Sequence, residues 1–284
     1  LQLMLSPARA SAKAAVRRSA LRDLVRHADG DRRAEVIACL AGVLTGDAEP
    51  GVRADAAVAL ADAAASEAVA ALLAATEDAH LRVRQLALVA LGELAEPGDP
   101  AALTALDAAL SHEAPALRYQ ALIGLVRLTE GDVSELVLAG TRDPDANVRH
   151  LAVRLLEERL TAAGERGGNR TAPELPASAA VRLRALLRDD APRVRLAAAI
   201  LLVRAGEDAG REGLVDAVNA PSGSFEADDE QAAVELAGAL RLAAARPGLR
   251  RRAFGWLGFS SDPTAFHARV ALARNGDRRA VGAI

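Results

Sequence analysis

The chain has 284 residues, a net charge of −3 and a single cysteine. This charge does not favour nucleic acid or an anionic membrane as the general partner, and one cysteine excludes an internal disulfide framework. Hydrophobic residues make up 51% of the chain but aromatic residues only 2%, so alanine, leucine and valine must form most of the core. Few large side chains therefore remain for a small-molecule site.

In chain order, the sequence predicts pairs of helices. Apolar-periodic segments at 32–44, 66–76, 100–110 and 133–141 are each followed by a turn and a second helix. The turn and the start of the second helix repeat one pattern, for example DAEPGVRADAAVAL at 47–60 and DPDANVRHLAVRLL at 143–156. Because no strand-like alternation competes, we expect an all-α chain of about seven to eight helical hairpins.

An arginine recurs near the start of the second helices. Valine or leucine precedes it, alanine follows three residues later and leucine seven residues later, which is the spacing of one buried helix face. An aspartate usually lies six residues before it, where the carboxylate can accept hydrogen bonds from the amides that begin the helix. The arginine can then bind the aspartate of its own or a neighbouring turn. The residues concerned are Arg17, Arg53, Arg84, Arg118, Arg149 and Arg195, with Asp47, Asp78, Asp143 and Asp189 in the turns, and with Ser11 and His112 at the aspartate position of two units.

The pattern D-x-x-x-x-V-R-x-x-A-x-x-x-L resembles the short bacterial HEAT-like repeats of the HEAT-repeat superfamily, and the resemblance covers nearly the whole chain. It implies a right-handed α-solenoid in which these arginines and aspartates form a structural ladder along the stack, called the arginine ladder below. We expect Arg84→Ala or Arg149→Ala to lower the free energy of unfolding by about 1–3 kcal/mol.

The repeats are interrupted after residue 163. The following segment is rich in Gly, Pro and polar residues, which predicts an exposed loop at 164–178. We expect N-terminal repeats at 1–163 and more degenerate repeats at 179–284, joined in one continuous solenoid. In the degenerate part, Glu226, Asp228, Asp229 and Glu230 are expected to complement the dipole of a helix start. In the last unit, Phe266 is aligned with the buried valine and His267 with the arginine.

No catalytic, cofactor-binding or metal site is expected. The five histidines occupy different repeat positions without the spacing of metal ligands. His112 and Glu113 form one His-Glu pair, whereas HEAT-like di-iron hydroxylases carry several. Cys39 lies in an apolar segment and is expected to be packed rather than nucleophilic. An activity like that of HEAT-like bilin lyases or alkylpurine DNA glycosylases is a remote alternative, because no motif supports the former and the aromatic residues that the latter place around DNA lie in unrelated units here.

The first hypothesis for function is a non-catalytic scaffold that binds another protein. A solenoid presents a long concave face made by its second helices. Residues one, two, five and nine positions after the ladder arginine avoid the buried spacing and are expected on this face. The partner-binding candidates among them are Tyr119, Gln120, Arg127, His150 and Arg154.

The C-terminal segment LRRRAFGWLGF provides a second candidate surface, for a partner or for self-association at a terminus. Phe254, Trp256 and Phe259 cannot share one face of a helix, so at least one ring is expected to be exposed. Trp and Arg are the residues that most often carry interface energy. The candidates in this segment are Arg250, Arg251, Trp256 and Phe259.

Binding of nucleic acid or another polyanion is the alternative hypothesis. Residues 241–284 contain nine Arg against two Asp, although the whole chain is acidic. A site that follows a phosphate backbone would lose affinity steeply as salt rises, which distinguishes it from most protein interfaces.

The compartment and the chain ends are inferred from the sequence alone. One cysteine fits a reducing compartment and no apolar run is long enough to span a membrane, so we expect a bacterial cytoplasmic protein without membrane insertion. The start LQLML has neither an initiator Met nor a signal-peptide pattern. Since neither LQLML nor AVGAI is polar enough to cap a stack of repeats, we expect the natural protein to continue beyond at least one end, or another chain to cover an end.

Overall fold

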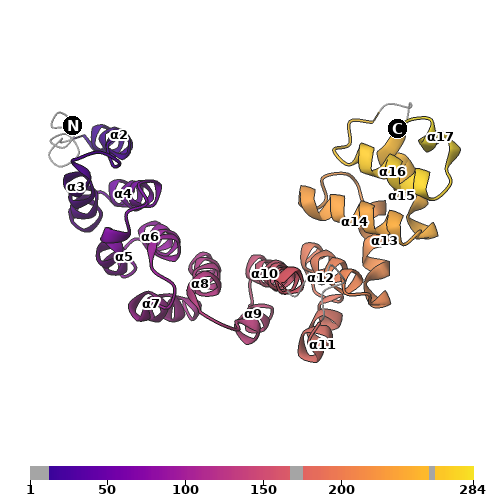
Figure 1. Cartoon of the computed structure of the whole chain (residues 1–284), viewed down its shortest axis with the longest axis horizontal. Helices are drawn as coiled ribbons and strands as arrows, with labels where there is room; N and C mark the ends of the chain where they lie inside the picture. The colour runs from indigo at the N-terminus through magenta and orange to yellow at the C-terminus, as the bar shows by residue number, and fades with distance from the viewer. Residues whose placement is uncertain (1–12, 167–174, 256–259) are drawn as a thin grey trace. The chain divides into compact units, whose positions relative to one another are not determined.

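The computed structural model describes residues 13–166, 175–255 and 260–284. Within these ranges all regular structure is helical, so the fold is the all-α solenoid of stacked hairpins that the repeats predict (Figure 1). None of the described helices is both long enough and apolar enough to cross a lipid bilayer. The chain divides into two compact units, unit 1 at residues 1–136 and unit 2 at residues 137–284.

Unit 1 consists of hairpins that follow one another along the chain. Its second helices pack on each other in sequence, α2 on α4, α4 on α6 and α6 on α8, and its first helices form the other row, α3 beside α5 and α5 beside α7 (Figure 1). The helices are α2 (Ala14–Val25), α3 (Arg33–Gly46), α4 (Pro50–Asp62), α5 (Val69–Ala75), α6 (Leu81–Leu94), α7 (Pro100–Leu110) and α8 (Pro115–Leu128), with a short 3-10 helix at Ser66–Ala68.

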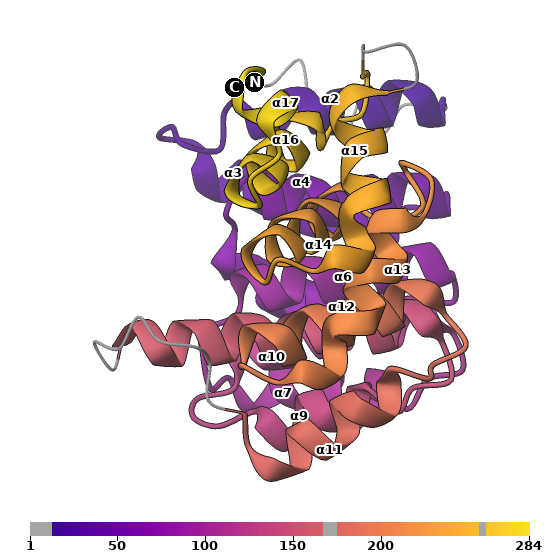
Figure 2. The same ribbon diagram turned by 90° about the vertical axis from the view of Figure 1, so that its right-hand side faces the viewer.

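Unit 2 repeats this arrangement. Its second helices α10, α12, α14 and α16 pack in order, and Figure 2 shows the helices of this unit stacked from α11 to α17. Helix α9 (Ser134–Gly140) crosses the boundary between the units. The remaining helices are α10 (Ala146–Arg166), α11 (Ala177–Leu186), α12 (Pro192–Arg204), α13 (Arg211–Asn219), α14 (Ala227–Ala239), α15 (Arg246–Phe254), α16 (Ala265–Arg274) and α17 (Arg278–Val281), with 3-10 helices at Asp208–Gly210 and Ala243–Ala245.

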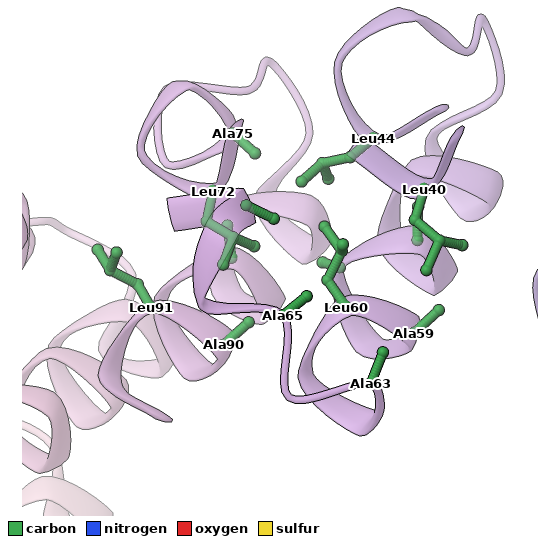
Figure 3. Close-up of a cluster of buried hydrophobic side chains, with 14 of the residues drawn as sticks. Leu40, Leu44, Ala59, Leu60, Ala63, Ala65, Leu72, Ala75, Ala90 and Leu91 are labelled. Carbon is green, nitrogen blue, oxygen red and sulfur yellow. The ribbon is translucent and has the colours of Figure 1, made fainter. Parts of the chain in front are cut away.

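The second helices start where the sequence predicts. Proline occupies the first turn of α4, α8 and α12, where its missing N–H breaks no helical hydrogen bond. The buried positions are mainly leucine and alanine. Figure 3 shows Leu60 of α4, Leu72 of α5 and Leu91 of α6 inside the core of unit 1, with alanines between them. Each buried leucine contributes about 1.5–3 kcal/mol of hydrophobic stabilisation, and the alanines let neighbouring helices approach closely.

Two glycines in unit 2 permit backbone contacts that no other residue would allow. A Cβ atom at Gly210 would lie 2.3 Å from the carbonyl oxygen of Ala199 on α12. A Cβ atom at Gly248 would lie 2.3 Å from the carbonyl oxygen of Val218 on α13. These glycines therefore set the close spacing of the first helices against their neighbours.

The two compact units meet between residues 136 and 137, within the predicted first group of repeats. The predicted grouping by repeat regularity, with repeats at 1–163, a loop at 164–178 and more degenerate repeats at 179–284, stays a prediction. Helix α10 continues to Arg166 and α11 begins at Ala177, because alanine and charged residues with high helix propensity extend both helices into the segment. Residues 167–174 of the predicted loop lie outside the described residues.

One expectation about aromatic residues is wrong and another stays a prediction. Helix α15 ends at Phe254, before Gly255 with a φ of 59°, and the exposure of one ring among Phe254, Trp256 and Phe259 stays a prediction. Phe254 is buried, and Trp256 and Phe259 lie outside the described residues. In α16 the buried spacing begins at Thr264 and continues through Ala268 and Leu272, two residues earlier than predicted, which leaves Phe266 exposed.

Candidate partner-binding surfaces

In the turn before a second helix, the side chain at the aspartate position of the ladder accepts a hydrogen bond from the backbone. Each aspartate accepts, through Oδ1, a hydrogen bond from the backbone amide two residues later, and His112 accepts in the same way through Nδ1 from Ala114 at 2.9 Å. These bonds satisfy amides at or just before the helix start that have no partner within the helix. The aspartates are Asp47, Asp78, Asp143 and Asp189, at 2.7–2.9 Å.

A ladder arginine can donate hydrogen bonds both to its own turn and to the turn of the next hairpin. Arg53 donates through Nη1 to the carbonyl oxygen of Asp47 in its own turn, at 2.8 Å. Its Nε and Nη2 donate to both carboxylate oxygens of Asp78 in the next turn, at 2.6 and 2.8 Å. Arg17 binds Asp47, and Arg149 binds Asp189, through the same two nitrogens. Such paired charge-assisted hydrogen bonds are stronger than neutral ones, and here they connect neighbouring hairpins inside each unit.

The remaining ladder arginines keep the contact with their own turn. Arg84, Arg118 and Arg195 donate through Nη1 to the carbonyl oxygen six residues before them, at 2.8, 2.9 and 2.7 Å. In front of Arg84 stands His112, whose Nε2 lies 3.5 Å from Arg84 Nη2. Arg84 Nε is buried without a hydrogen-bond partner. At this position Arg84 therefore faces the imidazole of His112, where the other paired arginines face an aspartate carboxylate.

Three of the ladder carboxylates, Asp47, Asp78 and Asp189, have pKa values below their usual range. The side-chain hydrogen bonds from Arg53 lower the pKa of Asp78. Burial raises the pKa of Asp47 and of Asp189, but the hydrogen bonds from their arginines and from backbone amides outweigh it, so both pKa values are lowered. The unfolded-state pKa is about 3.9, so the folded state binds fewer protons near that pH. The stabilisation is therefore complete above about pH 5 and is lost as the pH falls through 4 and below.

We expect the urea midpoint of the protein to fall between about pH 5 and pH 3 for this reason. Asp78→Asn removes one of the titrating carboxylates, so the variant should show a smaller fall over the same range. Urea unfolding followed by circular dichroism at several pH values measures both. Asp62→Asn, a change of an exposed carboxylate on α4, is the matched control and should keep the wild-type dependence. Equal falls for wild type and Asp78→Asn would contradict the assignment.

A buried network of charged side chains joins α10, α12 and α14. His150 Nε2 lies 3.1 Å from Asp229 Oδ2, and Arg154 Nη1 lies 3.3 Å from Asp229 Oδ1. Arg154 also donates to Glu157 at 2.8 Å, and Arg204 pairs with the other oxygen of Glu157. His150, Glu157 and Asp229 are buried. Two of the predicted partner-binding residues, His150 and Arg154, are thus brought together, but in contacts within unit 2.

Three side chains at the edge of this network could in principle hold a metal ion. The ligand atoms of His150, Glu226 and Asp229 lie within 4.8 Å of one another. However, the guanidinium of Arg154 lies 3.3 Å from Asp229 and would repel a cation bound there. Because arginines already balance the carboxylates, the donor set fits an ion-pair network better than a metal centre.

Beside the network, the second helices α12, α14 and α16 line a hollow of about 500 Å³, called the α12–α16 hollow below. Phe266 projects at its edge with 57% of its surface exposed. His267 Nε2 lies 3.5 Å from Glu235 Oε1. An exposed ring beside arginines over an apolar floor is the composition of many interface centres. The other lining residues are Arg204, Leu236, Ala239, Val270, Ala271 and Arg274.

A second hollow, of about 470 Å³, lies beside α15 and α17. Two of its lining residues are the predicted candidates Arg250 and Arg251. Arg250 is exposed and pairs with Asp277 at 2.8 Å, and Arg251 donates to the carbonyl oxygen of Asn219 at 2.5 Å. The other two candidates of this segment, Trp256 and Phe259, lie outside the described residues.

Most arginines of the C-terminal segment are exposed, but some of them bind partners within the fold and one is buried. Arg252 is 2% exposed and lies 3.2 Å from Glu230 and 3.3 Å from Asp262. Arg279 stacks over the ring of Phe254 at 4.1 Å. Because these guanidinium groups have partners in the fold, the excess of arginine in residues 241–284 does not form a uniformly free basic surface.

The candidates on α8 belong to unit 1. Tyr119 and Gln120 are half-buried, and Arg127 is exposed, with Nη1 4.0 Å from Glu93 Oε1. They lie on the row of second helices, as predicted, but the structure provides no hollow around them among those described.

Sequence reasoning missed the buried acids of α14. Asp229 and Glu230 were expected to complement the helix dipole, whereas they are 2% and 4% exposed and bind His150 and Arg252. A signal was present, because Asp229 precedes the buried Ala233 and Ala237 by four and eight residues, which places all three on one face. Without the fold, nothing in the sequence names the partners of these acids.

Comparison with known proteins agrees with the fold. The family model for HEAT repeats matches residues 40–126. The crystal structure of YibA from Escherichia coli aligns with a TM-score of 0.55 and 14% identity, over 94% of this chain and 98% of that one. Human deoxyhypusine hydroxylase in complex with glycerol aligns with a TM-score of 0.40 and 17% identity, over 97% and 95% of the two chains. The complex of CpcE and CpcF of phycocyanin lyase from Nostoc sp. PCC7120 aligns with a TM-score of 0.35 and 18% identity, over 99% and 92%. No curated protein matches the sequence.

Proposed function

We propose that this HEAT-repeat chain is a scaffold without catalytic activity, and that it binds a partner protein through the α12–α16 hollow. The observation that carries the proposal is the exposure of Phe266, at 57%, beside a hollow large enough for one or two side chains of a partner. An exposed ring over an apolar floor loses contact with water when it is covered, which favours association.

Charge at the hollow suggests the chemistry of the partner segment. Arg274 is exposed on α16, and Arg204 keeps 40% of its side chain exposed although it pairs with Glu157. Glu235 Oε1 lies 3.5 Å from His267 Nε2. A partner segment that inserts an apolar side chain and places a carboxylate beside it would match both the floor and the arginines.

Phe266→Ser tests this proposal. The whole chain carrying a tag is used to capture proteins from the source cell, and the proteins retained by wild type and variant are compared by mass spectrometry. We expect the specific partner to be lost from Phe266→Ser, because the variant removes the exposed ring. Val181→Ser is the matched control, since Val181 on α11 is 65% exposed and lies outside the hollow. Retention of every partner by Phe266→Ser, at unchanged helicity, would refute the assignment of the hollow.

Polyanion binding through the C-terminal segment is the second candidate function, supported by the exposed arginines Arg241, Arg274 and Arg278. Nuclease treatment and a salt titration of the same captured complex distinguish binding of a partner protein from binding of a polyanion. Binding that survives nuclease and depends weakly on salt supports the scaffold, and loss of affinity by orders of magnitude between low and physiological salt supports the polyanion site.

A further inference from the structure

The arginine ladder changes its chemistry at one place in unit 1, between Arg84 and His112. Arg84 is anchored like the other ladder arginines, because its Nη1 donates to the carbonyl oxygen of Asp78 at 2.8 Å. We call each contact of a ladder arginine with the next turn a rung. In the rungs of Arg53 and Arg149, Nε and Nη2 each donate to one oxygen of an aspartate. At Arg84, Nη2 faces an imidazole instead, and the buried Nε has no hydrogen-bond partner.

The tautomer of His112 follows from its hydrogen bond to the backbone. Nδ1 accepts from the amide of Ala114 at 2.9 Å, so in the neutral ring the proton is carried by Nε2. That Nε2–H points toward Arg84 Nη2, which is 3.5 Å away and is also a donor. Two donors, Arg84 Nη2 and His112 Nε2, therefore face each other without an acceptor between them, and Arg84 Nε of the same guanidinium is also without an acceptor.

The space in front of these donors is a small hollow of about 180 Å³. Its lining combines polar groups of Thr76, Arg84 and His112 with apolar side chains from α6, α7 and α8. Thr76 uses its hydroxyl to donate to the carbonyl oxygen of Leu73. Glu77 is the one carboxylate among the lining residues, and it is exposed. Its charge opposes an anion in the hollow, so it lowers the affinity of the site.

We propose that this hollow binds a small oxyanion, whose oxygens accept from Arg84 Nε, Arg84 Nη2 and His112 Nε2 in place of the aspartate carboxylate of the other rungs. A planar carboxylate matches the fork of the guanidinium with two parallel hydrogen bonds, and a phosphate group offers the same acceptors. Binding connects the hairpin of α6 to that of α8 and so stabilises unit 1. The proposal concerns unit 1 alone and stands independently of the partner surface of unit 2.

Thermal unfolding of the whole chain with acetate or inorganic phosphate as the probe provides the test, at constant ionic strength set with sodium chloride. In wild type we expect the melting temperature to rise and to saturate with at least one of the two anions, because a ligand that binds only the folded state stabilises it. A response to acetate alone identifies a planar carboxylate as the ligand, and a response to phosphate alone identifies a phosphate group.

His112→Asp is the decisive variant. The new aspartate supplies the carboxylate from within the chain, as Asp78 does for Arg53, so the variant should melt above the anion-free wild type and should no longer respond to either anion. Glu77→Gln removes the opposing charge and should shift the titration to lower anion concentration. The histidine nitrogen signals of wild type, followed by NMR, should show the Nε2–H tautomer of His112 and a shift of Nε2 on titration.

Three results would overturn the proposal. These are a flat melting temperature with both anions in wild type, an equal rise in wild type and His112→Asp, and His112 nitrogen signals that do not move at saturating anion. Because His112→Asp is expected to be more stable than wild type, its loss of response cannot come from unfolding, and its helicity is checked by circular dichroism.

Discussion

Replacement of Arg252 by leucine is expected to lower the free energy of unfolding by about 3–5 kcal/mol. The guanidinium is 2% exposed and lies between the buried carboxylates of Glu230 and Asp262. It also donates to the carbonyl oxygens of Ala217 and Val218 at the end of α13. Leucine fills much of the volume but leaves two carboxylates without their cationic partner. Glu230 then keeps the amides of residues 223–225 and Asp262 keeps Thr264 as donors, and a buried charge without a counter-charge is among the most costly defects in a fold.

Urea unfolding measured by circular dichroism gives this difference directly. Arg250→Leu on the same helix is the matched control, because Arg250 is 65% exposed and its partner Asp277 keeps hydrogen bonds from the amides of Arg279 and Ala280. The control should change the stability by about 1 kcal/mol or less. Adding Glu230→Gln to Arg252→Leu removes one of the two stranded charges and should recover part of the loss. A loss no larger for Arg252→Leu than for Arg250→Leu would show that the buried pairs contribute little.

The second large effect is expected at the ladder, and it should differ between two arginines with the same sequence pattern. Arg149→Ala removes two hydrogen bonds to Asp189, one to Asp190 and two to carbonyl groups of its own turn, and we expect a loss of about 3 kcal/mol. Arg84→Ala removes one hydrogen bond to a carbonyl group and strands no carboxylate. Its loss should be about 1 kcal/mol or less in a buffer without oxyanions.

Comparison of the two variants by urea unfolding in a chloride buffer separates the contribution of the carboxylate from that of the arginine. The sequence predicts the same effect, about 1–3 kcal/mol, at both sites. Equal losses at Arg84 and Arg149 would mean that the contact with the arginine's own turn dominates and that the partner in the next turn matters little.

The helices were accessible to sequence reasoning because local rules place them. The spacing of leucine and alanine, the proline in the first turn and the aspartate before it all act within a few residues, and the predicted segments 66–76 and 100–110 agree with helices that begin at Ser66 and Pro100. Prediction failed where a single residue sets the register. At the start of α16, the series of buried residues begins at Thr264 and not at Phe266. The last repeat has no ladder arginine, so its sequence does not show which residue begins the series.

The sites were less accessible because their contacts join residues far apart in the sequence. His150 was identified as an inner-face candidate, but its partner Asp229 is 79 residues away, and the acid looked like an ordinary helix-start residue. Arg252 was one of three consecutive arginines, and only packing shows that it is buried while Arg250 and Arg251 are exposed. A charge pattern gives the sign of a surface, whereas burial decides which charges belong to it.

The arginine ladder also affects which repeats such a chain can gain or lose during evolution. In the paired rungs a hairpin offers an acceptor to the hairpin before it and a donor to the hairpin after it, and the ladder arginines recur at steps of 31–36 residues between Arg17 and Arg149. Removing or duplicating the segment between two ladder arginines therefore brings an arginine and an aspartate of matching geometry together again. Unequal recombination inside the gene then yields a chain in which the two newly adjacent hairpins are still joined by an ion pair. The step that ends at His112 is the exception: deletion of residues 54–84 would place Arg53 opposite an imidazole and convert a strong junction into a weak one. Length variation among such genes should accordingly spare this step more often than the others.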